Sequence, residues 1–250
     1  MQWFMCQPQP GSQLNMVCFP YAGVSASVYL SWQERLPANV RVCPVVLPGR
    51  ENGDQRLPVR DFDRLVALMV SELLPLLRDC HYVLYGHSMG AWLAWHLAQY
   101  ATGDSSPQAL IISGQQAPHL DYPHETIIEA SDEEILRFIM RTNGLSARQL
   151  EQSGWRISFL KRFRNDIALC ESHRPDDESY QLALPMLLFG ASDDPLIPRD
   201  DMQAWQRHAS GPVYIHWQSG GHLFIQQTEG PFMSCLTQHL NALTEVQGVL

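Results

Sequence analysis

Residues 83–90, Val-Leu-Tyr-Gly-His-Ser-Met-Gly, constrain the fold of this chain more than any other stretch. An apolar run leads into the pattern Gly-x-Ser-x-Gly, and helix-forming residues follow at once. A strand, a tight turn and a helix around a serine form a nucleophile elbow, which holds Ser88 in a strained conformation with its hydroxyl exposed. Gly86 and Gly90 suit this turn because a Cβ there would collide with the neighbouring strand or helix. The stretch predicts a serine nucleophile, and the alternative is a serine in an ordinary strand-to-helix turn.

Short apolar runs alternate with helical patterns along most of the chain. Continuous apolar strands separated by helices are typical of a mostly parallel sheet with helices on both faces. Helices are expected near residues 28–36, after the capping residue Asp61 and from Pro231 onward. The first residues show no such pattern, and we expect a loose N-terminus. The expected strands cover residues 15–19, 40–47, 81–85, 109–114, 186–190 and 213–217.

The alternation stops between residues 118 and 180. Residues 131–134, Ser-Asp-Glu-Glu, form a capping box that opens an amphipathic helix, and a second helix is expected over residues 155–171. A helical insertion between the strands of such a sheet commonly forms a lid over the site. We therefore expect a single α/β domain over residues 1–250, with a helical lid insertion at approximately 118–180.

Composition excludes several classes of protein. With 250 residues, 45% hydrophobic and 17% charged, the chain suits one soluble domain. No apolar run reaches the roughly 18 residues of a membrane span, and the first residues lack the features of a signal peptide. The six cysteines are scattered without a Cys-x-x-Cys pair, which argues for a reducing cytoplasm and against a disulfide framework or a zinc site. We expect a cytoplasmic monomer that binds no metal and no membrane.

The charge of the chain is unevenly distributed. A formal net charge of −9 argues against nucleic acid as a partner. The segment from Arg137 to Arg174, however, carries eight basic and three acidic residues, a net charge of +5. A basic insertion in an acidic protein raises the question of which partner it meets.

The sequence offers a base and an acid for the serine. A serine hydroxyl needs a base to remove its proton, and the base needs a partner that orients it. On this kind of sheet the partners follow in the order Ser, acid, His, each in a loop beyond a strand. His222 follows the strand at 213–217 in a glycine-flanked loop. The loop after the strand at 186–190 contains Asp193 and Asp194, and the order alone leaves either as the acid.

Other histidines fit the role of the base less well. His87 lies within the elbow, where the turn directs it away from the serine hydroxyl. Four histidines on expected helices or strands are interpreted as structural or solvated: His96, His208, His216 and His239. Three others flank the helical insertion, and a role facing the substrate stays open for them: His119, His124 and His173.

Acyl transfer through a serine also needs two N–H donors for the oxyanion of the tetrahedral intermediate. Met89 follows the serine at the start of a helix and is expected to supply one. The loop after the strand at 15–19 is expected to supply the other, with the backbone N–H of Ala22 as the candidate. A plain strand-to-helix turn would have the same composition, so this alternative stays open.

Five motifs occur together and in order between Cys18 and Phe224. They are Phe-Pro-Tyr-Ala-Gly at 19–23, Leu-Pro-Gly-Arg-Glu at 47–51, Gly-His-Ser-Met-Gly-Ala at 86–91, Asp-Asp-Pro at 193–195 and Gly-Gly-His-Leu-Phe at 220–224. In this combination the chain resembles the type II (external) thioesterases of nonribosomal peptide and polyketide synthesis, in the α/β-hydrolase superfamily. The sequence departs from that pattern at Val24 and Leu223, and most of all in the helical insertion, which leaves the acyl-chain preference open.

The resemblance implies a proofreading hydrolase of secondary-metabolite synthesis. Such an enzyme removes aberrant or stalled acyl groups from the phosphopantetheine arms of carrier domains by a Ser-His-Asp acyl-enzyme mechanism, without a cofactor of its own. It also implies Asp194 as the acid, because the aspartate nearest the proline matches best. In integrated, chain-terminating thioesterases the acid commonly follows the earlier strand. Here that strand is followed by no carboxylate until Asp121, which favours the external type.

The basic insertion fits a docking surface for carrier domains, which are generally acidic. The candidate docking residues are Arg156, Lys161, Arg162 and Arg164. The alternative is a solvated helix face with pairs four residues apart, such as Arg162 and Asp166. Arg50 and Glu51 are expected to form a structural ion pair or loop contact.

Rival functions share the same serine, acid and histidine. A carboxylesterase, lipase or peptidase would use the same three groups, and an acyltransferase would differ only in the group that accepts the acyl chain. A non-catalytic protein that binds carrier domains would need none of the three, and the complete set argues against it.

Overall fold

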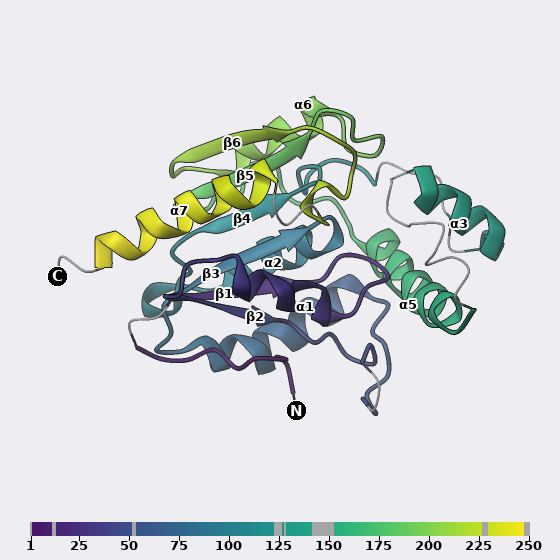
Figure 1. The fold of residues 1–250 in the computed structure, drawn as a ribbon, viewed down its shortest axis with the longest axis horizontal. Coiled ribbons are helices and arrows are strands. Elements are labelled where there is room, and N and C mark those ends of the chain that lie inside the picture. Colours follow the sequence, from purple (N-terminus) through teal and green to yellow (C-terminus); the bar gives the residue numbers. More distant parts are fainter. Residues whose placement is uncertain are drawn as a thin grey trace.

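The computed structural model describes residues 2–11, 14–51, 54–122, 127, 129–141, 153–226 and 230–247. Its centre is a six-stranded sheet in the order β2-β1-β3-β4-β5-β6, in which every neighbouring pair is parallel. The parallel sheet expected from the sequence is thereby confirmed (Figure 1). The strands are β1 (Leu14–Phe19), β2 (Val40–Pro44), β3 (Tyr82–His87), β4 (Leu110–Ser113), β5 (Met186–Ala191) and β6 (Val213–Gln218).

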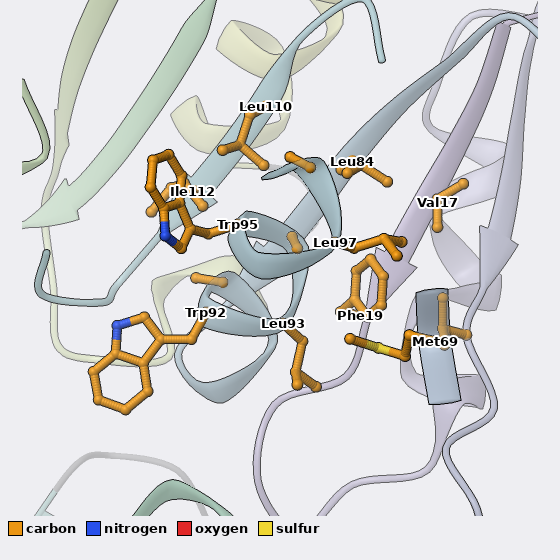
Figure 2. Close-up of a cluster of buried hydrophobic side chains, with 14 of the residues drawn as sticks. Val17, Phe19, Met69, Leu84, Trp92, Leu93, Trp95, Leu97, Leu110 and Ile112 are labelled. Carbon is orange, nitrogen blue, oxygen red and sulfur yellow. The ribbon is translucent and has the colours of Figure 1, made fainter. Parts of the chain in front are cut away.

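Both faces of the sheet are buried. Alternate residues of each inner strand belong to two separate hydrophobic clusters, because successive side chains of a strand point to opposite faces. In β3, for example, Leu84 belongs to one cluster and Val83 and Tyr85 to the other. Figure 2 shows the first cluster, with Trp95 and Leu97 of the helix after β3 among residues of the strands. Burying each such side chain stabilises the fold by roughly 1.5–3 kcal/mol.

Helices cover the sheet, and their N-termini follow from the sequence. Asp61 caps the first α-helix by accepting a hydrogen bond from the N–H of Arg64 at 2.8 Å. None of the described helices has the length and hydropathy required to cross a bilayer. The α-helices are α1 (Phe62–Leu68), α2 (Met89–Tyr100), α3 (Asp132–Arg141), α5 (Ser153–Ser172), α6 (Arg199–Gln203) and α7 (Pro231–Gln247).

Between β1 and β2 the chain forms a 3₁₀ helix, η1 (Ala26–Glu34), slightly earlier than the helix expected at 28–36. The buried side chains of η1 are Ala26, Tyr29 and Trp32. They recur every third residue, which aligns them on one side of a 3₁₀ helix with three residues per turn. Tyr29 also donates a hydrogen bond to the carbonyl oxygen of Phe19, so η1 is attached to the end of β1.

The expectation of a loose N-terminus is wrong for the described residues. Trp3 and Phe4 are fully buried in the first cluster. Phe4 forms an antiparallel bridge with Val45, and Met5 donates a backbone hydrogen bond to the carbonyl oxygen of Pro44. Strand β2 ends at Pro44, so Val45 lies just beyond it. The strand expected at 40–47 is therefore three residues shorter in the structure.

The helical insertion between β4 and β5 contains α3 and α5. The predicted capping box is present, because Ser131 and Glu134 exchange side-chain and backbone hydrogen bonds at the start of α3. The two helices share a hydrophobic cluster of their own and lie side by side at one end of the sheet (Figure 1). His124 and Arg148, to which the sequence drew attention, lie outside the described residues.

The turn between β3 and α2 is too tight for side chains at its two glycines. A Cβ at Gly86 would lie 2.0 Å from the carbonyl oxygen of Gly90, and one at Gly90 would lie 2.3 Å from that of Phe19. Real Cβ contacts are never so short, and the atoms involved are backbone atoms of packed elements. The space around Ser88 therefore depends on these two glycines.

We expect Gly90→Ala to lower the free energy of unfolding by about 3 kcal/mol or more, because β1 and α2 must separate to admit the methyl group. Gly154→Ala is the matched control, since a Cβ at Gly154 meets nothing within 4 Å. It should change stability by less than about 1 kcal/mol. Urea unfolding followed by circular dichroism measures both, and equal stabilities of the two variants would contradict the packing argument.

Candidate active site

Ser88 occupies the turn between β3 and α2 with φ of 50° and ψ of −127°. Positive φ is uncommon outside glycine, and such strain persists only where the surroundings fix it. Here β3 lies between β1 and β4, and the N–H of Ser88 donates to the carbonyl oxygen of Ser113 at 2.9 Å. The backbone geometry is that of the nucleophile elbow expected from the sequence, at the carboxyl edge of the sheet.

Asp194 and His222 meet beside this turn. They lie in the loops that follow β5 and β6, two adjacent parallel strands. Nδ1 of His222 lies 2.8 Å from Oδ2 of Asp194, and both side chains are almost fully buried. The other carboxylate oxygen accepts the N–H groups of Leu196 and Ile197 at 2.9 and 3.2 Å. The carboxylate is therefore fixed at both oxygens, and its bond to Nδ1 leaves Nε2 as the nitrogen that can take up a proton.

The neighbouring aspartate makes different contacts. Oδ2 of Asp193 lies 2.9 Å from the hydroxyl of Ser192 and accepts the N–H of Gly220 at 3.3 Å. The bond from Gly220 joins the two loops that carry Asp194 and His222. Asp193 itself is exposed. Of the two aspartates that the sequence left open, Asp194 is the one that contacts the imidazole.

Ser88 and His222 line a pocket of about 460 Å³. Ala22 and Met89 line the same pocket. The helical insertion supplies a largely apolar wall to it, from α3 and α5 together. That wall includes Phe138, Ile139, Phe159, Phe163 and Ile167. A pocket with a reactive serine and histidine and with apolar walls suits an acyl chain attached to a polar carrier group.

Met89 and Ala22, the two expected sources of oxyanion N–H groups, both line this pocket. Met89 is the first residue of α2, so its N–H has no acceptor within the helix. It also lies at the positive end of the helix dipole. Ala22 reaches the pocket because β1 lies beside β3, with Phe19 paired to Gly86, and the loop after β1 therefore lies next to the elbow. Both residues thus lie next to Ser88, as the two oxyanion donors expected from the sequence would have to.

The other described histidines that were considered do not line the pocket. Nδ1 of His87 lies 2.8 Å from the hydroxyl of Ser113, and burial lowers the pKa of His87 well below its usual value. His173 stacks on Trp92 at 4.4 Å between ring centroids, and burial lowers its pKa to about 4. His119 pairs with His208 at 2.7 Å. These contacts support structural roles.

The four candidate docking residues do not form one free surface. Arg156 and Lys161 are exposed on α5. Arg164 donates from Nη2 to Oδ1 of Asp132 at 2.7 Å, which joins α5 to α3. Arg162 turns inward, lines the pocket and donates from Nε to the carbonyl oxygen of Gly23 at 3.1 Å.

Arg50 and Glu51 make two separate structural contacts. Arg50 forms a buried ion pair with Asp166 of α5, rather than with Glu51. Glu51 accepts the hydroxyl of Ser25 and the N–H of Ala26 at the start of η1. Sequence reasoning missed the role of Asp166, although its spacing from Arg162 had marked it as part of a helix pair.

Two clusters among the described residues have side chains that metals bind. One consists of His96, His173 and Asp176, and the other of His216, Cys235 and His239. In each cluster two imidazoles face each other through Nε2, at 3.1 Å and 2.8 Å respectively. None of these residues lines the pocket of Ser88, so neither cluster bears on its chemistry.

Comparisons with known proteins identify relatives in both sequence and structure. A family model described as "Thioesterase domain" matches residues 15–242. "Linear gramicidin dehydrogenase LgrE" of Brevibacillus parabrevis is 30% identical over 236 residues, covering 92% of this chain and 89% of that protein. RedJ, a thioesterase from the prodiginine biosynthetic pathway in Streptomyces coelicolor, is 31% identical with a TM-score of 0.82, covering 95% of this chain and 93% of that chain. YbtT, a type II thioesterase from the yersiniabactin NRPS/PKS biosynthetic pathway, is 27% identical with a TM-score of 0.81, covering 96% and 98%.

One of these relatives carries the name of a dehydrogenase. Dehydrogenases with a doubly wound sheet bind the pyrophosphate of a dinucleotide at a Gly-x-Gly-x-x-Gly turn after the first strand. That pattern does not occur in this sequence, where the turn after β1 reads Phe-Pro-Tyr-Ala-Gly. The glycine-bounded turn of this chain follows β3 instead and holds a serine.

We expect Asp194→Asn to lower kcat by about 10⁴-fold, because an amide would orient the imidazole in the wrong tautomer. Asp193→Asn is the matched control and should retain kcat within a few-fold, since Asp193 contacts the loops and not the imidazole. Steady-state hydrolysis of a small acyl thioester measures both. A larger loss for Asp193→Asn than for Asp194→Asn would assign the acid to Asp193.

Proposed function

The chain belongs to the thioesterase domain family, and we propose that it is a type II thioesterase that clears acyl groups from the carrier domains of a nonribosomal peptide or polyketide synthase. The family's members hydrolyse thioesters. The observation that carries the proposal is the pairing of His222 with Asp194 together with a serine at positive φ, where Ser88 and His222 line one pocket. RedJ, from the prodiginine biosynthetic pathway, and YbtT, from the yersiniabactin NRPS/PKS biosynthetic pathway, each match nearly the whole chain.

In the proposed mechanism the hydroxyl oxygen of Ser88 attacks the thioester carbonyl while Nε2 of His222 takes the proton. Asp194 stabilises the imidazolium that forms. The N–H groups of Met89 and Ala22 donate hydrogen bonds to the oxyanion. The intermediate collapses, and His222 returns the proton to the departing pantetheine sulfur.

The acyl-enzyme on Ser88 is then hydrolysed by the same groups, with water as the nucleophile in place of Ser88. His222 takes a proton from water, the hydroxide adds to the ester carbonyl, and the same two N–H groups hold the second oxyanion. Collapse of this intermediate returns the proton to Ser88 and releases the free acid. The steps require no metal or cofactor of the enzyme's own, which we propose as a property of this chain.

The apolar wall from α3 and α5 supports a lid function for the helical insertion. Its residues line the pocket and share one hydrophobic cluster. We assign to it the binding of the acyl chain. Such an enzyme works in the cytoplasm on carrier domains delivered by a larger synthase, and we propose that it acts as a monomer.

The test is a panel of acyl-carrier thioesters that differ in acyl chain, assayed with the protein and with Ser88→Ala. We expect Ser88→Ala to lose at least about 10³-fold in kcat on every substrate, because the remaining groups cannot supply a nucleophile. Parallel assays with acyl-CoA and p-nitrophenyl esters separate the proposed function from a general esterase. A preference for the simple esters over acyl-carriers, or near-normal activity of Ser88→Ala, would contradict it.

The exposed residues of α5 provide a second test, of the carrier as partner. We expect Arg156→Glu with Lys161→Glu to raise KM for an acyl-carrier several-fold by repelling its acidic surface, and to leave KM for a small acyl thioester unchanged. Arg137→Glu is the matched control, a charge reversal on α3 that lies outside the candidate docking residues. Equal changes in KM for both substrates would contradict docking at these two residues.

A further inference from the structure

Three side chains of α5 hold one residue of the loop after β1. Oδ2 of Asp166 accepts the N–H of Gly23 at 2.7 Å, and Nε of Arg162 donates to its carbonyl oxygen at 3.1 Å. The ring of Phe159 packs against the same residue, so closely that a Cβ on Gly23 would lie 2.5 Å from it. Phe159, Arg162 and Asp166 are spaced three and four residues apart, which places them on one face of the helix.

Gly23 has a conformation that α5 is well placed to maintain. Its φ is +84°, in the left-handed region that glycine adopts freely and other residues rarely do. A glycine has many alternative conformations, so its geometry must be fixed from outside. Both of its backbone polar groups are fixed by side chains of α5, and its missing Cβ makes room for the ring of Phe159.

The residue before Gly23 is Ala22, the proposed second oxyanion donor. The N–H that Asp166 holds belongs to the peptide that joins Ala22 to Gly23, so the chain on the C-terminal side of Ala22 is set by α5. On the N-terminal side, Tyr29 holds the carbonyl oxygen of Phe19 at 3.0 Å, and Gln226 donates to the hydroxyl of Tyr21 at 3.2 Å. The orientation of the Ala22 peptide thus depends on contacts from both directions.

Asp166 is buried and surrounded by charge. Its side chain is 7% exposed and forms the ion pair with Arg50. Arg162 of α5 and Arg50 stabilise its ionised form, and Cys170, one turn further along α5, also faces it. Burial nevertheless raises the pKa of Asp166 to about 6. At neutral pH the group is a carboxylate that accepts hydrogen bonds from Gly23 and Arg50 together.

We propose that Asp166 is a positioning residue of the oxyanion hole, which acts through Gly23 to aim the N–H of Ala22 at the reacting carbonyl. Docking of α5 is then a condition for a complete oxyanion hole. When α5 is docked against the loop after β1, the helical insertion would therefore complete the oxyanion hole, besides covering the acyl chain. This inference rests on the proposed function, because it assumes a tetrahedral oxyanion formed on Ser88.

The test separates binding of the transition state from binding of the substrate. A trifluoromethyl ketone forms a tetrahedral adduct with the serine oxygen and mimics the oxyanion, whereas a thioether analogue of the substrate forms no adduct. We expect Asp166→Asn to lower kcat by about 10- to 10³-fold, the upper value being the cost of losing one donor. Affinity for the ketone should fall in parallel, while KM and the Kd of the thioether stay within about twofold.

Asp132→Asn is the matched control for the helical insertion. It removes the carboxylate that pairs with Arg164 between α3 and α5, at a site that does not touch Gly23. Both ligands should bind this variant as they bind the wild type. Should Asp166→Asn fail to fold, Arg162→Gln provides a second variant, because it removes the hydrogen bond to the carbonyl oxygen of Gly23. We expect the same losses of kcat and of ketone affinity from it. The two losses should be less than additive in the double variant, since both act through one residue.

The outcomes are distinguishable. Folded Asp166→Asn and Arg162→Gln proteins with unchanged ketone affinity and kcat would overturn the inference and leave Asp166 as an anchor of α5 alone. So would equal losses of affinity for the ketone and the thioether, which would indicate damage to the pocket. A wild-type protein that forms no ketone adduct and hydrolyses no thioester would instead overturn the proposed function.

Discussion

The close approach of β1, β3 and α2 around Ser88 is the constraint on which the rest of the site depends. The carbonyl oxygens of Gly90 and Phe19 occupy the space that side chains at Gly86 and Gly90 would need. This packing keeps Ser88 at positive φ and makes Met89 the first residue of a helix, with its N–H free of helical bonds. One packing arrangement therefore brings both the serine and the expected oxyanion donor Met89 to the pocket.

The other residues of the site lie near this turn because the strands of the sheet are parallel. In a parallel sheet the carboxyl ends of neighbouring strands lie along one edge, so loops far apart in sequence meet there. The loop after β1 brings Ala22 to one side of the elbow, and the loops after β5 and β6 bring Asp194 and His222 to the other. The helical insertion then closes the arrangement through α5, whose Asp166 and Arg162 reach back to Gly23.

The sequence could predict what depends on local patterns. The elbow, the alternation of strands and helices, the capping of the helices at Asp61 and Ser131, and the order of Ser88, Asp194 and His222 all have short-range signals.

The sequence could not predict contacts between distant residues. Trp3 and Phe4 carry no strand periodicity, and they are buried by contacts with residues far along the chain, among them the bridge between Phe4 and Val45. Arg50 and Asp166 are 116 residues apart, and only the seated helix α5 brings them together. Charge alone suggested the docking residues. In the structure, contacts within the protein turn Arg162 inward and pair Arg164 with Asp132.

The central claim is that Ser88 carries the acyl group between two steps. Rapid quenching of the protein after mixing with an acyl-carrier thioester, followed by mass spectrometry of its peptides, measures this directly. The account predicts a transient mass increase equal to the acyl group on the peptide that contains Ser88, which disappears as the free acid accumulates. Release of the acid with no adduct at any time point, or an adduct on another residue that turns over at the steady-state rate, would contradict it.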